Sequence, residues 1–188
     1  MVQLKKNSLI AVVNLPDPNL AAPLAEVLLK NEISSIEITF RNENAYQSLY
    51  NIKMKNLPMN VGAGTVRTLE DAKAAIKAGV DFMVSPGLNT EVISYVDANS
   101  SIPFFPGIDS TIGIELAMQL GLKVLKFFPA NVSGGVKWLR SMMGPYYDVQ
   151  FIPTGGVNFE NLEEYLLLPN VISVGGSFLA PTPVIMAK

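Results

Sequence analysis

The chain has 188 residues, with 49% hydrophobic side chains, only 16% charged residues, and no histidine or cysteine. This composition excludes thiol nucleophiles, Ser-His triads, disulfides and zinc sites built on His or Cys, so any acid-base or covalent chemistry depends on carboxylates, lysines, arginines and hydroxyls. The net charge of -2 and the lack of a basic patch argue against nucleic acid and anionic membranes as partners.

The length favours one domain over residues 1–188, and the low charge content leaves apolar surface for a subunit interface. The longest apolar run near the N-terminus covers residues 9–13, too short for a signal-peptide core or a membrane span. We therefore expect a cytoplasmic protein. A magnesium site made only of carboxylates stays open at this point.

Short β-branched apolar runs alternate with helical patterns along the chain, which is typical of βα units and a parallel sheet. Eight strands with seven intervening helices fit a (βα)8 TIM barrel better than an open doubly wound sheet, although barrels usually need ~200 to 250 residues. The expected strands, in chain order, are 9–14, 35–40, 59–63, 82–85, 102–105, 123–128, 150–153 and 171–175. The helices with the clearest signals are 20–30, 68–79, 115–120 and 159–167.

Lys126 is the strongest chemical signal in the chain. It lies in the middle of the run 124–129, which is otherwise typical of a buried strand. Desolvation disfavours the charged form of a buried amine, and neutral lysines most commonly attack carbonyls to form a Schiff base. The structural alternative is a lysine whose stem crosses apolar surface while its ammonium group reaches water.

The second expected strand carries three polar side chains on one face. In a TIM barrel the site lies at the C-terminal ends of the strands. Alternation along the strand 35–40 sends Glu37, Thr39 and Arg41 into the barrel and the apolar residues toward the helices. A buried Glu37–Arg41 ion pair is the structural alternative. Residues four apart on a strand are separated by ~13 Å, so the two are better placed to hold a ligand between them.

Glycine clusters follow the last two expected strands. They include Gly155 with Gly156, and Gly176 with Ser177. Backbone N–H groups at glycines can approach an anion closely, and barrels often bind phosphate after strands seven and eight. A single Gly-Gly pair is no more than a turn signal, so the phosphate site is predicted from two clusters on adjacent strands. The segments 134–135 and 62–65 are further candidates.

Together these motifs resemble the pyruvate-forming class I aldolases that cleave 2-keto-3-deoxy-6-phosphogluconate (KDPG) and 4-hydroxy-2-oxoglutarate (KHG). The resemblance covers residues 10–181. It implies that Lys126 is the Schiff-base lysine and Glu37 the general base. The matching segments are Glu37-Ile38-Thr39-Phe40-Arg41, Gly62-Ala63-Gly64-Thr65-Val66, Ser85-Pro86-Gly87, Pro106-Gly107, Lys126-Phe127-Phe128-Pro129-Ala130, Gly134-Gly135-Val136-Lys137, Pro153-Thr154-Gly155-Gly156 and Val174-Gly175-Gly176-Ser177.

The same resemblance assigns the substrate-binding residues. Arg41 and Thr65 would bind the pyruvate carboxylate. It further implies a homotrimer of the Entner-Doudoroff pathway that works on a phosphorylated 2-keto-4-hydroxy acid without a cofactor or metal. The residues implied to line the pocket are Pro86, Phe128 and Thr154, and those implied to hold the phosphate are Gly155, Gly156, Gly176 and Ser177.

The sequence also departs from the family pattern. Asp109, Ser110 and Gly113 stand where the family commonly has a small residue, a Thr and a Glu, which leaves the substrate preference open. A reduced N-terminal helix and a missing final helix are expected. The alternatives are an aldolase for the 6-phosphogalactonate epimer or for unphosphorylated KHG, and a catalytically silent phospho-sugar binding protein.

Overall fold

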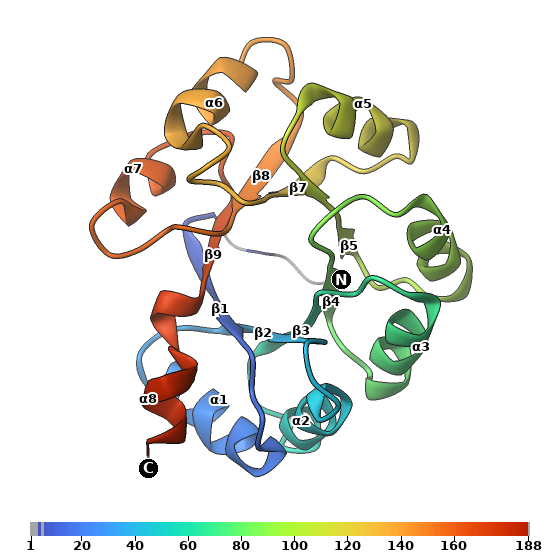
Figure 1. The fold of residues 1–188 in the computed structure, drawn as a ribbon, viewed down its shortest axis with the longest axis vertical. Helices are drawn as coiled ribbons and strands as arrows, with labels where there is room; N and C mark the ends of the chain where they lie inside the picture. The colour runs from blue at the N-terminus through green and yellow to red at the C-terminus, as the bar shows by residue number, and fades with distance from the viewer. Residues whose placement is uncertain (1–3, 5, 188) are drawn as a thin grey trace.

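The computed structural model describes residue 4 and residues 6–187. Figure 1 shows strands at the centre of the molecule and helices arranged around them. The strands are β1 (Ser8–Val13), β2 (Ser35–Thr39), β3 (Asn60–Gly64), β4 (Phe82–Val84), β5 (Phe104–Phe105), β6 (Gly107–Ile108), β7 (Val124–Phe127), β8 (Gln150–Pro153) and β9 (Ser173–Gly176). The α-helices are α1 (Ala21–Lys30), α2 (Ala45–Lys53), α3 (Leu69–Ala78), α4 (Thr90–Asn99), α5 (Thr111–Gln119), α6 (Gly135–Met142), α7 (Leu162–Leu166) and α8 (Thr182–Met186).

The strand pairs are parallel, which confirms the predicted parallel α/β class. One sheet has six strands in the order β5-β4-β3-β2-β1-β9, and the other has three in the order β6-β7-β8. Isolated bridges from Phe151 to Val171 and from Thr154 to Gly175 link the β8 segment to the β9 segment. The C-terminal strand ends therefore lie on one side of the molecule.

The sequence predicted eight strands in one barrel, whereas the described residues form nine strands in two sheets. The difference lies at Pro106, which separates β5 from β6. Proline has no N–H to donate to a ladder. Its carbonyl still accepts a 2.9 Å hydrogen bond from the Lys126 N–H, and the chain passes here from the sheet of β4 to the sheet of β7.

Helix ends follow the capping residues. The Thr68 side chain accepts from the Asp71 N–H while Asp71 accepts from the Thr68 N–H, and Gly79 ends α3 at φ 69°. This confirms the capping box and the glycine stop predicted there. The predicted helix 159–167 is shorter in the structure, because Asn158 Oδ1 accepts from two following N–H groups and holds a turn before α7.

A short helix, α8, follows the last strand, so the expectation of no final helix was wrong. Two prolines, Pro181 and Pro183, frame its first turn, where proline is tolerated because the first N–H groups of a helix lack intrahelical acceptors. Ile185 packs against the core near α1. The predicted reduced N-terminal helix falls in part on residues 1–3 and 5, which lie outside the described residues.

Alternation along the strands separates two kinds of core. Outward residues such as Ile36 and Ile38 pack under the helices. The inward-facing layer is formed by Ile10, Phe82, Val84, Phe105 and Ile152, which pack together with Leu4.

Within the described part of the chain, no helix is long and apolar enough to cross a membrane.

Candidate active site

Lys126 and Glu37 form a buried ion pair between β7 and β2. Lys126 Nζ donates to Glu37 Oε1 at 3.3 Å, and the two side chains are only 6% and 3% exposed. The alternative in which the amine reaches water is therefore wrong. Removing either partner would leave an uncompensated buried charge, which is strongly destabilising. Buried pairs of ionisable groups are found more often in active sites than in ordinary protein cores.

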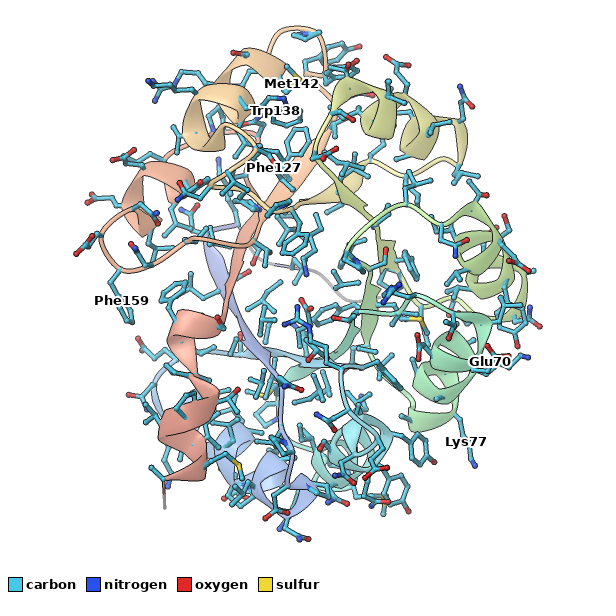
Figure 2. The ribbon with its side chains drawn as sticks, in the orientation of Figure 1. Glu70, Lys77, Phe127, Trp138, Met142 and Phe159 are labelled. Atoms are coloured by element: carbon cyan, nitrogen blue, oxygen red, sulfur yellow. The ribbon has the colours of Figure 1, made fainter. Side chains whose placement is uncertain are left out.

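The side chains of β7 alternate as the sequence predicted. Figure 2 shows Phe127 beside Trp138 of α6, and the two rings stack with centroids 4.4 Å apart. Because neighbouring strand residues point to opposite faces, Lys126 and Phe128 share the inner face. Lys126 Nζ lies 5.4 Å from the centroid of the Phe128 ring, close enough for a favourable cation–π contact.

Glycine makes room for the carboxylate of Glu37. Any Cβ placed on Gly64 of the neighbouring β3 would collide with that side chain. Thr39, two residues further along β2, is fully buried and donates its hydroxyl to the Val13 carbonyl at 3.2 Å. Glu37 and Thr39 thus share the inner face of β2, as expected.

A cavity of about 700 Å³ opens where β1, β2, β7, β8 and β9 end. Lys126 and Glu37 do not line the cavity themselves. Each lies two residues before a wall residue on the same strand face, Phe128 for Lys126 and Thr39 for Glu37. Seven of the predicted site residues line the cavity, namely Arg41, Phe128, Thr154, Gly155, Gly156, Gly176 and Ser177.

Arg41 lies at the exposed side of this cavity. Its Nε donates to Thr65 Oγ1 at 3.3 Å, so the two residues predicted to bind a carboxylate lie together. Thr65 has φ 59°, a left-handed conformation that is unfavourable for a β-branched residue and is often found at functional sites. Among the described residues no salt bridge joins Arg41 to Glu37, so the structural alternative of a buried pair is also wrong.

Pro86 does not line the cavity. It borders a separate pocket of about 280 Å³ together with Arg67 and Leu88. Its carbonyl lies against Gly107, where no Cβ would fit, and Gly107 is the register partner of Lys126. Pro86 therefore lies next to β6, the strand that neighbours Lys126, without reaching the cavity, and its role stays a prediction.

Backbone N–H groups gather on the β8–β9 side of the cavity. Gly155 and Gly156 have φ 93° and 78°, a region that L side chains rarely adopt. Within the described part of the chain, no residue accepts a hydrogen bond from the N–H of Gly156 or Ser177, whereas the N–H of Gly155 lies on the bridge between Thr154 and Gly175. A Cβ on Gly176 would collide with the Phe178 ring. This side can offer several neutral donors to an anion.

The three departures from the family pattern lie away from this cavity. Asp109 is exposed just after β6, and Ser110 begins α5 without a side-chain cap. Gly113 faces Ile108, so a Cβ there would press on that side chain. None of the three belongs to the cavity wall.

Several residues of the cavity wall were not predicted from the sequence. Asn14 is the residue directly after β1, and Phe178 and Thr182 follow β9. Asn14 could have been found, because a polar residue directly after a buried strand lies at the same rim as Arg41. Phe178 and Thr182 depend on the path of the chain after β9, for which the strand pattern carries no signal.

A family model described as KDPG and KHG aldolase matches residues 1–188. A 2-dehydro-3-deoxy-phosphogluconate aldolase of Haemophilus influenzae is 36% identical over 186 residues, which cover 99% of this chain and 87% of that protein. A crystal structure of KDPG aldolase from Legionella pneumophila, with pyruvate captured at low pH as a covalent carbinolamine intermediate, has a TM-score of 0.92 at 36% identity, covering 97% of this chain and 88% of that one. The KDPG aldolase of Zymomonas mobilis ZM4 with 3-phosphoglycerate has a TM-score of 0.88 at 32% identity, covering 95% and 84%.

A buried amine within hydrogen-bond reach of a carboxylate is the arrangement that a Schiff-base aldolase uses. The chain belongs to the KDPG and KHG aldolase family. The family predicted from the sequence is thereby confirmed, while the roles of the individual residues stay predictions.

Proposed function

We propose that this protein is a class I aldolase, a lyase that cleaves KDPG, with KHG as a shorter substrate, to pyruvate and an aldehyde. The observation that carries the proposal is the buried pair of Lys126 Nζ and Glu37 Oε1 at 3.3 Å. An amine in that setting can pass its proton to the carboxylate and attack a carbonyl. The carbinolamine of the Legionella relative supports the same chemistry for this chain.

The reaction begins when the neutral Lys126 amine attacks the C2 ketone. Glu37 gives the proton that it took from the amine to the carbinolamine hydroxyl, which leaves as water, so Glu37 is again a carboxylate. The iminium that remains draws electrons from the neighbouring carbons. Glu37, through a water, takes the proton of the C4 hydroxyl, so the C3–C4 bond breaks and the aldehyde departs. The remaining enamine takes a proton at C3 from Glu37, and hydrolysis releases pyruvate and the amine.

Arg41 and Thr65 would orient the pyruvate half. A guanidinium can hold a carboxylate with two parallel hydrogen bonds, which fixes the direction of the ketone. The Nε contact to Thr65 directs the guanidinium group at the cavity rim. With the carboxylate so held, the ketone stays within reach of Lys126 and the reaction becomes effectively intramolecular.

Phosphate would bind on the opposite side, at Gly155, Gly156, Gly176 and Ser177. The N–H groups of Gly156 and Ser177 support this proposal because they have no acceptor among the described residues. The Zymomonas relative with 3-phosphoglycerate supports a phosphorylated acid as ligand. Two or three charge-assisted bonds at roughly 1.5 to 3 kcal/mol each allow a preference of ~10² to 10⁴-fold for KDPG over KHG.

We infer that β5 and β6 are one strand interrupted at Pro106 and that the two bridges to β9 close a (βα)8 barrel, a single domain over residues 1–188. A cytoplasmic homotrimer is proposed as the assembly. Exposed apolar side chains on α5, Ile112 at 72% and Leu116 at 41%, support an interface. Light scattering should give three chain masses.

A coupled assay of pyruvate release tests the activity with KDPG, its 6-phosphogalactonate epimer and KHG. We expect release from all three, fastest from KDPG, and no loss on addition of EDTA because the iminium itself accepts the electrons. Absence of pyruvate with every substrate would refute the proposal. Loss on chelation that a divalent ion restores would refute the metal-free mechanism.

A further inference from the structure

Asn14 is the cavity residue whose chemistry the proposed function does not use. It lies just after β1, half-buried, on the wall that also contains Gly176 and Ser177. Pairing of β1 with β9 brings Ala11 opposite Gly176, and Thr182 donates its hydroxyl to the Asn14 carbonyl at 2.9 Å. Asn14 therefore belongs to the side of the cavity where the backbone N–H groups gather.

Two backbone groups fix the orientation of the neighbouring amide, Asn42. The Asn44 N–H donates to Asn42 Oδ1 at 2.9 Å, and Asn42 Nδ2 donates to the Leu15 carbonyl at 3.3 Å. A backbone N–H can only donate and a carbonyl can only accept, so the oxygen and nitrogen of Asn42 cannot exchange places.

The orientation of Asn42 then sets that of Asn14. Asn42 Nδ2 also lies 2.7 Å from the side chain of Asn14, and because it is a donor the atom facing it must be Oδ1. Asn14 Nδ2 is thus turned away from Asn42. No described residue accepts a hydrogen bond from it.

We propose that the Asn14 amide nitrogen donates a hydrogen bond to the phosphoryl group of the substrate and so contributes to the choice between KDPG and KHG. The inference rests on the proposed function and adds to it a side-chain donor held in place by Asn42. The Asn14 amide adds a neutral side-chain donor to the backbone N–H donors on this side of the cavity. Asn42 is a positioning residue, because it acts only through Asn14.

Asn14→Asp tests the inference with little change of shape. It keeps an oxygen for Asn42 and replaces the donor by a negatively charged acceptor. The ratio of kcat/KM for KDPG to that for KHG should fall by at least about 10-fold, the worth of one hydrogen bond to a charged group. Asn42→Ala should lower the same ratio less, through a higher KM for KDPG at nearly constant kcat.

Asn51→Ala is the matched control. Asn51 Nδ2 donates to the Pro18 carbonyl at 2.9 Å, so it ties an amide to the same segment after β1 without touching Asn14. Its ratio should equal that of the wild type. If Asn14→Asp does not fold, Asn14→Ala removes the donor without adding charge, and a fall of about 10-fold is again expected.

The outcomes separate the two proposals. Exchange of the methyl protons of pyruvate by the wild type tests the Schiff-base chemistry without any phosphate. If that exchange occurs but the Asn14 variants lower both substrates equally, or neither, the role of Asn14 is refuted and the aldolase stands. If exchange is absent in the wild type, the proposed function fails and this inference fails with it.

Discussion

The two sides of the cavity differ in their chemical groups. Behind the β2–β7 side, Glu37 and Lys126 are a buried pair of side chains, 3% and 6% exposed, whose charged atoms lie 3.3 Å apart. On the β8–β9–β1 side, Gly156, Ser177 and Asn14 present neutral N–H donors. Bond making requires reactive side chains at fixed distances, whereas holding an anion requires several donors of modest strength. Damage to the first side should therefore stop the chemistry, and damage to the second should change substrate choice.

The largest effect is expected from Lys126→Met, which removes the nucleophile and keeps most of the apolar stem. Pyruvate release from KDPG and KHG should fall on the order of 10⁴-fold or more, as for other covalent catalysts. Lys123→Met is the matched control, since Lys123 lies on the surface with its side chain 62% exposed. Activity within tenfold of the wild type in Lys126→Met would contradict the assignment. Circular dichroism checks that the variant folds.

Glu37→Gln should have the next largest effect. The amide keeps the shape of the carboxylate but cannot take a proton, so exchange of the pyruvate methyl protons should slow by about 10²-fold or more. Schiff-base formation should persist. Nuclear magnetic resonance in deuterated buffer measures the exchange, and a wild-type rate would show that another group, with Thr39 the first candidate, moves the proton.

Gly176→Val damages the other side of the cavity. The new side chain must displace the Phe178 ring and would block approach to the backbone there. Turnover of KDPG should fall about 10-fold or more beyond that of KHG, the worth of one charge-assisted hydrogen bond. Gly144→Val is the control, because a Cβ at Gly144 meets no atom within 4 Å. Equal losses on both substrates would indicate a folding defect and remove the contrast between the two sides.

The smallest effect concerns stability at high pH, away from both sides. Burial raises the pKa of Tyr165, which is only 2% exposed, and the Glu164 carboxylate adds to the shift. Below the unfolded-state pKa of ~10 the hydroxyl is protonated in both states; as the pH rises through the folded-state pKa its contribution to stability is lost. Urea midpoints from pH 8 to 11 should therefore fall less in Tyr165→Phe than in the wild type. Tyr147→Phe, at an 86% exposed position, should match the wild type. A Tyr165→Phe curve that follows the wild type would refute this origin of the alkaline loss.

Sequence periodicity predicted the parts of this molecule that depend on local pattern. The strand 150–153 was predicted with its observed bounds, and the inward face of β2 with Glu37 and Thr39 follows from period-two alternation. The stop of α3 at Gly79 follows from the left-handed conformation that glycine adopts readily. These features need no knowledge of distant contacts.

Features that depend on distant contacts could not be predicted from the sequence. The pairing of Lys126 with Glu37 joins residues 89 positions apart, and alternation alone cannot show which inward residues meet. The break at Pro106 is visible only in the strand pairing, because β5 pairs with β4 while β6 pairs with β7. The amide relay from Asn44 through Asn42 to Asn14 exists only where the loops after β1 and β2 meet.

The central claim is that Lys126 is the amine that attacks the substrate, and borohydride reduction in the presence of pyruvate tests it most directly. Reduction converts the iminium into a stable amine, so the protein should lose activity and gain one pyruvate-derived adduct. The chain has eleven lysines, and among the described ones Lys126 alone is buried. Mass spectrometry of the digested protein shows which lysine carries the adduct. The account predicts the adduct on Lys126. An adduct on any other lysine, or none at all, would contradict it.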